Sequence, residues 1–364
     1  MGFSPGYSLM PSMPPNRHPY LPLLCLLLLA AASGCVSGRT GESTPRPEPE
    51  ARAAAAKEAP AEPPVEHRAV SILSESTLFT VYGRAFGRAP ILGRLGTYRG
   101  FEDMEQDIQP WIEGISSRHD KKRVIPALHL IYAMAIPCVP GDDCLLYLEG
   151  IEKDIVGTYI EQAARRGWMV ILDTQIGKST PVAQVQRILD KGYLKYDNVA
   201  VAIDPEFSAA PGQETPPGRP IGTVKAAQIN KIQKMLDDYT REHRLPTRKI
   251  LIVHQFGDAN VDDGVPHMIQ DKKSLETFDN VELVFDADGL GGQAVKMVKY
   301  NRMTDAAVYP FTRFRGIKIF FPNRWEKHGH FDTPPMELDQ IFGLEPARGG
   351  KIRMENKPDV VIIA

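Results

Sequence analysis

The feature that most constrains the fold is a series of eight short apolar segments that alternate with helical patterns from about residue 70 onward. Such bounded runs, rich in β-branched residues, are typical of strands buried on both faces of a parallel sheet. The alternation of strands and helices over about 290 residues predicts a (β/α)8 barrel. The predicted strands are 78–84, 124–131, 169–175, 199–206, 250–255, 281–288, 317–321 and 360–363.

The end of the sequence departs from a complete (β/α)8 pattern, because it stops directly after the eighth predicted strand. We therefore expect the last helix to be absent or to be replaced by a helix over 71–77. An open, doubly wound sheet is the alternative fold. A further helix is expected between the second and third strands, where apolar residues follow 3–4 spacing up to Gly167 at Leu148, Ile151, Ile155 and Tyr159.

Residues 1–34 have the pattern of a signal peptide. The apolar stretch 21–32 is too short to span a membrane and follows Arg17. The sequence Ala-Ser-Gly-Cys that ends at Cys35 resembles a bacterial lipobox, so we expect Cys35 to be lipidated and to anchor the exported chain to a membrane of the cell envelope. Cleavage after Ala32 would instead release a soluble secreted product.

The region behind the anchor divides in two. Residues 35–70 are rich in Pro, Ala and Glu and have few large apolar residues, so we expect a disordered tether. Residues 71–364 are expected to form the barrel domain. Within it, Cys138 and Cys144 flank a turn-rich loop and predict a disulfide in an oxidising compartment.

Charged and polar residues recur at the carboxyl ends of the predicted strands. The fourth strand ends in Asp204-Pro-Glu206, whose two carboxylates share a face because strand side chains alternate, and Pro205 is expected to end the strand. Isolated charges in buried strands are costly unless they are paired or face a hydrated mouth. We therefore expect one shared polar pocket at the carboxyl ends rather than separate salt bridges. The other contributors are Asp173 and Gln175, His254 and Gln255, Asp286 and Asp288, and Lys318.

The chemistry of these side chains suggests roles. Glu206, a carboxyl group among apolar strands and other acids, is the candidate general acid, and Asp204 would orient it or stabilise a positive intermediate. Asp286 and Asp288 are candidates for the second carboxylate that glycoside hydrolysis needs. Lys318 is expected to neutralise a buried aspartate. The predicted substrate-binding residues are Asp173, Gln175, His254, Gln255, Tyr82 and Trp325. His254 is equally explained as a core histidine, and a tyrosine in a strand, such as Tyr82, is usually a core residue.

Several short motifs carry a resemblance. They are Leu-Asp-x-Gln at 172–175, Asp-Pro-Glu-Phe at 204–207, Val-His-Gln-Phe at 253–256 and Asp-x-Asp-Gly-x-Gly at 286–291. As a set they resemble a group of secreted bacterial (β/α)8-like lipoproteins, a resemblance that implies export and a barrel but no particular activity. More distantly, the Asp-x-Glu of the fourth strand is similar to barrel glycoside hydrolases of the chitinase and lysozyme-like kinds, in which that Glu is the acid. The chain departs from that pattern in having Ala200 and Ala202 upstream and no carboxylate ending strand seven.

The sequence thus predicts a lipid-anchored, glycoside-hydrolase-like protein that acts on an envelope or extracellular glycan. It assigns no cofactor and no metal. One alternative is a lipoprotein that binds a glycan or small polar ligand without catalysis. Another is a metal-dependent hydrolase with Asp204, Glu206, Asp286 and His254 as ligands. The net charge of −2 argues against a nucleic-acid partner, and no feature predicts an oligomeric state.

Overall fold

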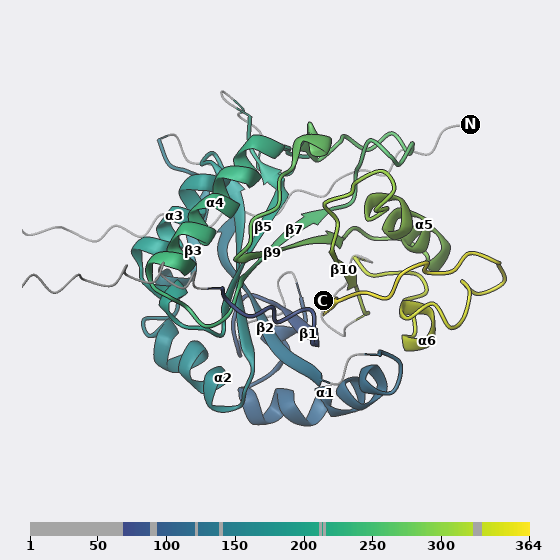
Figure 1. Ribbon diagram of the computed structural model, residues 1–364, viewed down its shortest axis with the longest axis horizontal. Coiled ribbons are helices and arrows are strands. Elements are labelled where there is room, and N and C mark those ends of the chain that lie inside the picture. Colours follow the sequence, from purple (N-terminus) through teal and green to yellow (C-terminus); the bar gives the residue numbers. More distant parts are fainter. Residues whose placement is uncertain are drawn as a thin grey trace, which may run out of the picture. The chain divides into compact units, whose positions relative to one another are not determined.

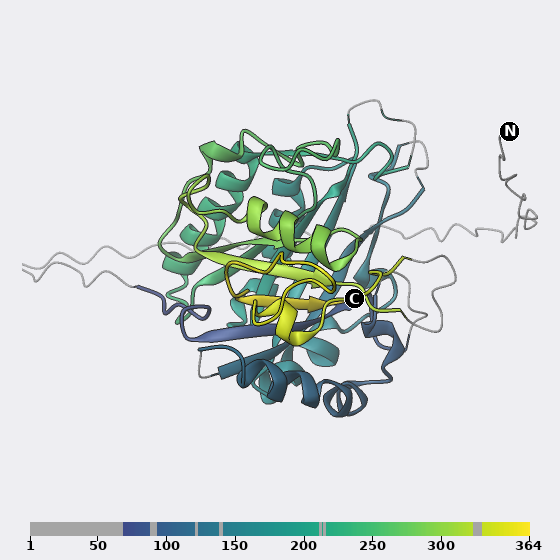
Figure 2. The same cartoon turned by 90° about the vertical axis from the view of Figure 1, so that its right-hand side faces the viewer.

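Eight parallel strands close into a barrel with helices between them (Figure 1). The computed structural model describes residues 68–87, 93–120, 123–137, 141–210, 213, 216–322 and 330–364. Strand β1 pairs with both β2 and β11, and this closes the sheet; Figure 2 shows purple β1 beside yellow β11. The open-sheet alternative is therefore wrong. The barrel strands are β1 (Ser76–Gly83), β2 (Arg123–Ala135), β4 (Met169–Gly177), β5 (Val199–Ser208), β7 (Lys249–Gln255), β9 (Val281–Ala287), β10 (Phe314–Ile319) and β11 (Val360–Ile363).

Helices cover the outside of the barrel between most strands. The predicted helix between the second and third strands begins later than expected: a 3-10 turn at Leu148–Gly150 is followed by a π-helical stretch, Val156–Ile160, that runs into α2 (Glu161–Arg165). A minor strand, β3 (Leu145–Tyr147), pairs antiparallel with β2, and β6 (Val224–Lys225) pairs with β8 (Ile269–Gln270). The α-helices are α1 (Phe101–Ser116), α2 (Glu161–Arg165), α3 (Pro181–Asp190), α4 (Ala226–Glu242), α5 (Gln293–Met303) and α6 (Leu338–Ile341).

The segment before β1 is a plug rather than a helix. Residues 71–75 form a turn, and Ser76 and Thr77 already belong to β1, so the predicted helix over 71–77 is wrong. Leu73 packs with the apolar residues inside the barrel. The inward-facing Glu282 of β9 accepts hydrogen bonds from the Leu73 backbone N–H at 3.2 Å and from the Ser71 hydroxyl. This turn therefore closes the amino end of the barrel and satisfies a buried carboxylate there.

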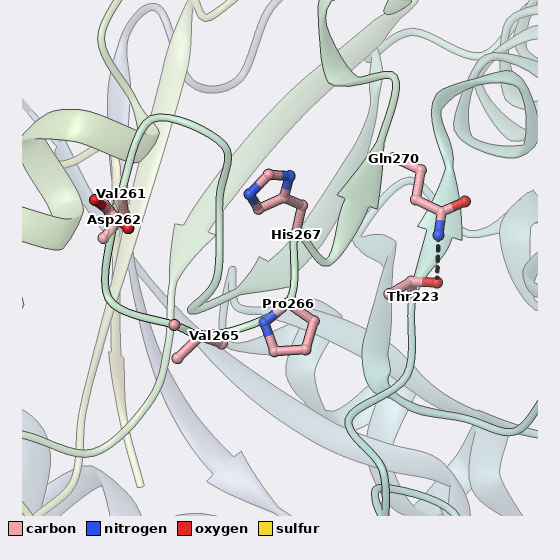
Figure 3. Close-up of a pocket in the computed structure, with 8 residues that line it drawn as sticks. Thr223, Val261, Asp262, Val265, Pro266, His267 and Gln270 are labelled. Carbon is pink, nitrogen blue, oxygen red and sulfur yellow. Dashed lines mark hydrogen bonds between the residues drawn. The ribbon is translucent and has the colours of Figure 1, made fainter.

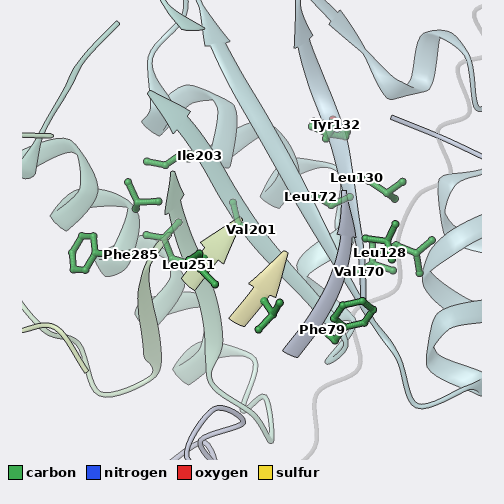
Figure 4. Packing of buried hydrophobic residues seen from close by; sticks show 14 of the residues in the cluster. Phe79, Leu128, Leu130, Tyr132, Val170, Leu172, Val201, Ile203, Leu251 and Phe285 are labelled. Atoms are coloured by element: carbon green, nitrogen blue, oxygen red, sulfur yellow. The ribbon is translucent and has the colours of Figure 1, made fainter. Parts of the chain in front are cut away.

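The period-two alternation of the strands separates two apolar layers. Outward residues such as Leu128, Val201 and Leu251 pack against the helices (Figure 4). Inward residues such as Ile171 and Ile252 pack against one another in the lower half of the barrel. The turn closes the amino end of the barrel, and inward apolar side chains fill its lower half. Among the described residues, the barrel interior can therefore hold a polar site only at the carboxyl ends of the strands.

Candidate active site at the carboxyl ends of the strands

A pocket of about 570 Å³ lies at the carboxyl ends of the barrel strands. Its polar lining comes from separate strands, because residues of inward parity at the ends of parallel strands converge. Its apolar wall includes Phe207, Phe256 and Phe320. The polar lining includes Tyr82 of β1, Gln175 of β4, Asp204 and Glu206 of β5, Asp288 after β9 and Lys318 of β10. Of the expected contributors, five therefore share one pocket in the described structure: Gln175, Asp204, Glu206, Asp288 and Lys318.

The position of Glu206 depends on an irregular end of β5. Pro205 does not end the strand as expected; β5 continues to Ser208, and the pairing with β4 shifts between Gln175 and Gly177, which accommodates the missing donor. The Glu206 backbone N–H donates to the Asp204 Oδ1 at 3.3 Å, and the Gly222 N–H donates to the Glu206 carbonyl at 2.7 Å. A side chain at Gly222 would collide with the Pro205 and Ser208 carbonyls, so only glycine allows this loop to hold the strand end.

Glu206 is half-buried and carries an altered acidity. Burial, followed by the negative charge of Asp288, raises the pKa of Glu206 to about 7. Burial also raises the pKa of Asp204 well above its ordinary value, with the Glu206 charge acting in the same direction. Near neutral pH the pocket therefore presents a carboxyl group that can donate a proton.

Lys318 supplies the positive charge of the pocket. Its Nζ lies 3.0 Å from the Asp288 Oδ2 and 3.7 Å from the centre of the Tyr82 ring. Burial opposes the charge of Lys318, but Asp288 and Asp204 raise its pKa above the ordinary value. Burial likewise would raise the pKa of Asp288, yet Lys318 and His254 hold it below its ordinary value. Asp288 is therefore ionised, and Lys318 makes the pairing with a buried aspartate that the sequence suggested.

A second polar layer lies directly beneath this pocket and is fully buried. It contains His129 of β2, Asp173 of β4, His254 of β7 and Asp286 of β9. The His254 Nδ1 lies 2.8 Å from the Asp286 Oδ2, and the His254 Nε2 lies 3.4 Å from the His129 Nε2. Gly316 of β10 makes room for Asp286, because a Cβ there would approach the Asp286 Oδ1 to 3.0 Å.

The two histidines of this layer differ in acidity. Burial lowers the pKa of His129 well below its ordinary value, and the charge of His254 lowers it further. Burial also opposes the charge of His254, but Asp173 and the hydrogen bond with Asp286 raise its pKa to about 9. Without a bound cation, His254 is therefore the protonated member of the pair.

The structure separates the predicted site residues by depth and by face. Asp173, His254 and Asp286 lie below the pocket rather than at its lining, whereas Tyr82 and Gln175 line it. Gln255 points to the opposite face of β7, where its Oε1 accepts a hydrogen bond from Lys272 at 3.1 Å, so its expected contact with substrate is not supported. The predictions of substrate stacking, lipidation and the disulfide concern Trp325, Cys35 and Cys138, which lie outside the described residues, as do 1–34 and nearly all of the tether.

His129 is a site residue that the sequence analysis missed. It interrupts the apolar run Ala-Leu-His-Leu-Ile of the second strand, and this single polar residue of inward parity was the available signal. Of the described residues, two sets of three have ligand atoms close enough to share a metal ion: His129, Asp173 and His254, or His254, Asp286 and Asp288. Neither set is the one that the sequence suggested for a metal-dependent hydrolase, which was Asp204, Glu206, Asp286 and His254.

Another hollow, of about 470 Å³, lies between the loop after β7 and the start of β6 (Figure 3). On one side of it, Gln270 donates a hydrogen bond to the Thr223 hydroxyl at 3.1 Å. Asp262 and His267 are the ionisable side chains of its described lining. These side chains do not converge as those of the barrel mouth do.

Comparisons with family models, curated proteins and solved structures returned no match. No helix of the described residues is long and apolar enough to cross a membrane.

Proposed function

We propose that the barrel mouth is the active site of a glycoside hydrolase that acts on an envelope or extracellular glycan. The observation that carries the proposal is Glu206, a carboxyl group with a pKa near 7 that lines an open pocket together with the ion-paired Asp288. Glycoside hydrolases usually use two carboxyl groups in different environments, one that donates a proton and one that remains charged.

Glu206 is the general acid in this proposal. Its Oε–H would protonate the glycosidic oxygen as the bond to the anomeric carbon breaks. The resulting Glu206 carboxylate would then take a proton from the water molecule that forms the new bond to that carbon, which restores the acid. Asp288, charged and held by Lys318, would face the positive charge that develops on the sugar. Asp204 is a positioning residue, because it accepts the backbone N–H of Glu206 and lies beneath it. Asp286 is assigned a positioning role through His254 rather than the catalytic role suggested by the sequence, because it is fully buried.

The apolar wall of the pocket suits a sugar. Phe207, Phe256 and Phe320 present aromatic surface next to the carboxylates. Sugar rings have apolar faces that pack on aromatic rings and hydroxyls that bond to polar groups. The mixed lining supports a carbohydrate better than a wholly apolar or wholly charged ligand.

The proposal includes the cellular setting expected from the sequence. The chain would be exported with the signal peptide 1–34, lipidated at Cys35 and held away from the membrane by the tether. A tether of about thirty residues spans roughly 30 Å as a flexible chain, which is enough to reach glycan near a membrane surface.

A second candidate is a glycan-binding lipoprotein without catalysis. The observation that favours it is the ion pair between Lys318 and Asp288, which already occupies one carboxylate of the pocket. A bound sugar would then meet fixed charges that orient its hydroxyls.

Turnover and binding of a panel of glycans, including peptidoglycan and chitin fragments, separate the two candidates. Glu206→Gln keeps the shape and removes the proton, so turnover should fall by roughly 100-fold or more while binding persists. Wild-type turnover should also fall as pH rises through about 7, where Glu206 loses its proton. The matched control is Glu345→Gln at an exposed glutamate. Equal turnover by wild type and Glu206→Gln would remove Glu206 from the mechanism, and binding without any turnover would support the second candidate.

A further inference from the structure

The buried layer beneath the pocket brings two histidines and one aspartate together from three different strands. His129, Asp173 and His254 have no exposed surface. We propose that these three side chains bind one divalent transition metal ion, of which Zn²⁺ is the representative, inside the barrel. The proposal is independent of the proposed hydrolase activity.

The separations of the three ligand atoms match a single ion. The His129 Nε2 and His254 Nε2 are 3.4 Å apart, and the Asp173 Oδ2 lies 3.8 Å and 3.7 Å from them. A point equidistant from three atoms at these separations lies about 2.1 Å from each. Zinc–nitrogen and zinc–oxygen bonds have lengths of about 2.0–2.2 Å, so an ion fits without moving any strand.

The imidazoles approach each other in the required orientation. Their ring centres are 5.2 Å apart while their Nε2 atoms are only 3.4 Å apart, so the rings meet through their Nε2 corners rather than by stacking. Two ring nitrogens that face each other at this distance need something positive between them, either a proton or a metal ion.

Asp286 supplies an outer partner for one of the two proposed histidine ligands, His254. Its Oδ2 lies 2.8 Å from the His254 Nδ1, which fixes the proton on Nδ1 and leaves Nε2 free to bind a metal. A carboxylate behind a metal-binding histidine is the usual outer partner in such sites. The other possible set of three is less suitable, because Lys318 already occupies the Asp288 Oδ2 and Asp286 already occupies the His254 Nδ1.

Asp173 is the independent indication that a ligand is expected. Its side chain is fully buried, and although the Tyr82 side chain interacts with it, no hydrogen bond of ordinary geometry reaches either of its oxygens. Without a metal ion, its charge partner is the protonated His254, whose Nε2 lies 3.7 Å from the Asp173 Oδ2. A buried carboxylate with so few donors is costly, and coordination of a metal ion would compensate for it more fully. Asp173 faces the two Nε2 atoms, so an ion at their centre would satisfy this carboxylate.

Tyr82 separates the proposed ion from the pocket. Its ring lies 5.0 Å from the His129 ring and 6.1 Å from the His254 ring, and the same side chain lines the pocket. The ionisable groups on the pocket side, besides Tyr82 itself, include Lys318, Asp204, Glu206 and Asp288. The ion would therefore lie under the floor of the pocket and tie β2, β4 and β7 together.

The test uses the full chain, stripped with a chelator and titrated with Zn²⁺ alone against a competing chromophoric chelator. We expect one ion per chain. Asp173→Asn and His129→Gln should each weaken binding by about 100-fold or more, and Asp286→Asn by about 10–100-fold. The matched control is His267→Gln in the open hollow of Figure 3, which should bind within twofold of wild type.

Two measurements keep the proposal refutable if a variant fails to fold. Co²⁺ bound to the wild type should show the strong visible absorption of four- or five-coordinate cobalt, and a spectrum no different from that of the aqueous ion would refute the site. Wild type that binds no stoichiometric Zn²⁺, or folded variants that bind as tightly as wild type, would also overturn it. Glu206→Gln should retain Zn²⁺ affinity, so loss of the hydrolase proposal leaves this one standing.

Discussion

Replacing Glu206 by glutamine should make the folded protein more stable than wild type at alkaline pH. The folded-state pKa of Glu206 is about 7, against an ordinary value of 4.5. Below pH 4.5 the carboxyl group is protonated in both states and resembles the glutamine amide. As pH rises toward 7, the unfolded chain releases this proton while the folded chain retains it, so unfolding becomes more favourable in wild type. Above pH 7 the loss of stability in wild type is complete, because Glu206 is then ionised in both the folded and the unfolded state.

The size of this effect follows from the difference between the folded-state pKa of Glu206 and its ordinary pKa. A difference of about 2.5 pKa units corresponds to about 3.4 kcal/mol at 1.36 kcal/mol per unit. Glu206 retains some exposure at the pocket, so solvent screening reduces this upper bound. We expect the free energy of unfolding of Glu206→Gln to rise by roughly 1–3 kcal/mol relative to wild type between pH 4 and pH 8.

Urea unfolding of the full-length wild type and of Glu206→Gln, at pH steps from 4 to 8.5, measures this difference. Other buried acids titrate in both proteins, and subtraction removes most of their contribution. The exposed Glu345→Gln is the control and should give a pH-independent difference. A Glu206→Gln difference that stays constant within about 0.5 kcal/mol across this range would refute the assigned acidity, since a shifted group must produce a slope.

Three further outcomes are expected. Lys318→Met should lower the free energy of unfolding by about 3–5 kcal/mol, because it leaves the buried Asp288 without its partner; adding Asp288→Asn should recover part of the loss, and no recovery would count against the pairing. Cys35→Ser should move the exported protein from the detergent phase to the aqueous phase, and an unchanged partition would contradict lipidation. Thiol labelling and mass spectrometry of native exported protein should find Cys138 and Cys144 joined, and two labelled thiols would contradict the bridge.

The strands of the barrel were predictable from the sequence because their signal is local. β-branched apolar runs mark β4, β5 and β11 to within about two residues. The alternation of side chains also predicted which carboxylates share a face, as with Asp204 and Glu206. Closure of the sheet, in contrast, depends on the pairing of β1 with β11, which are distant in the sequence.

The sequence by itself therefore determined the strands, their order along the chain and the polar character of their carboxyl ends. Only the tertiary structure decided how deep each of these polar side chains lies below the mouth of the barrel. Asp286 and Asp288 share a parity, yet the pairing of Asp286 with His254 buries the first, while the second reaches the pocket. The tertiary structure also placed His129 beside these residues, although the sequence analysis had not selected it. The physical reason is that alternation along one strand assigns a face, whereas the level of a side chain depends on how neighbouring strands are staggered around the barrel.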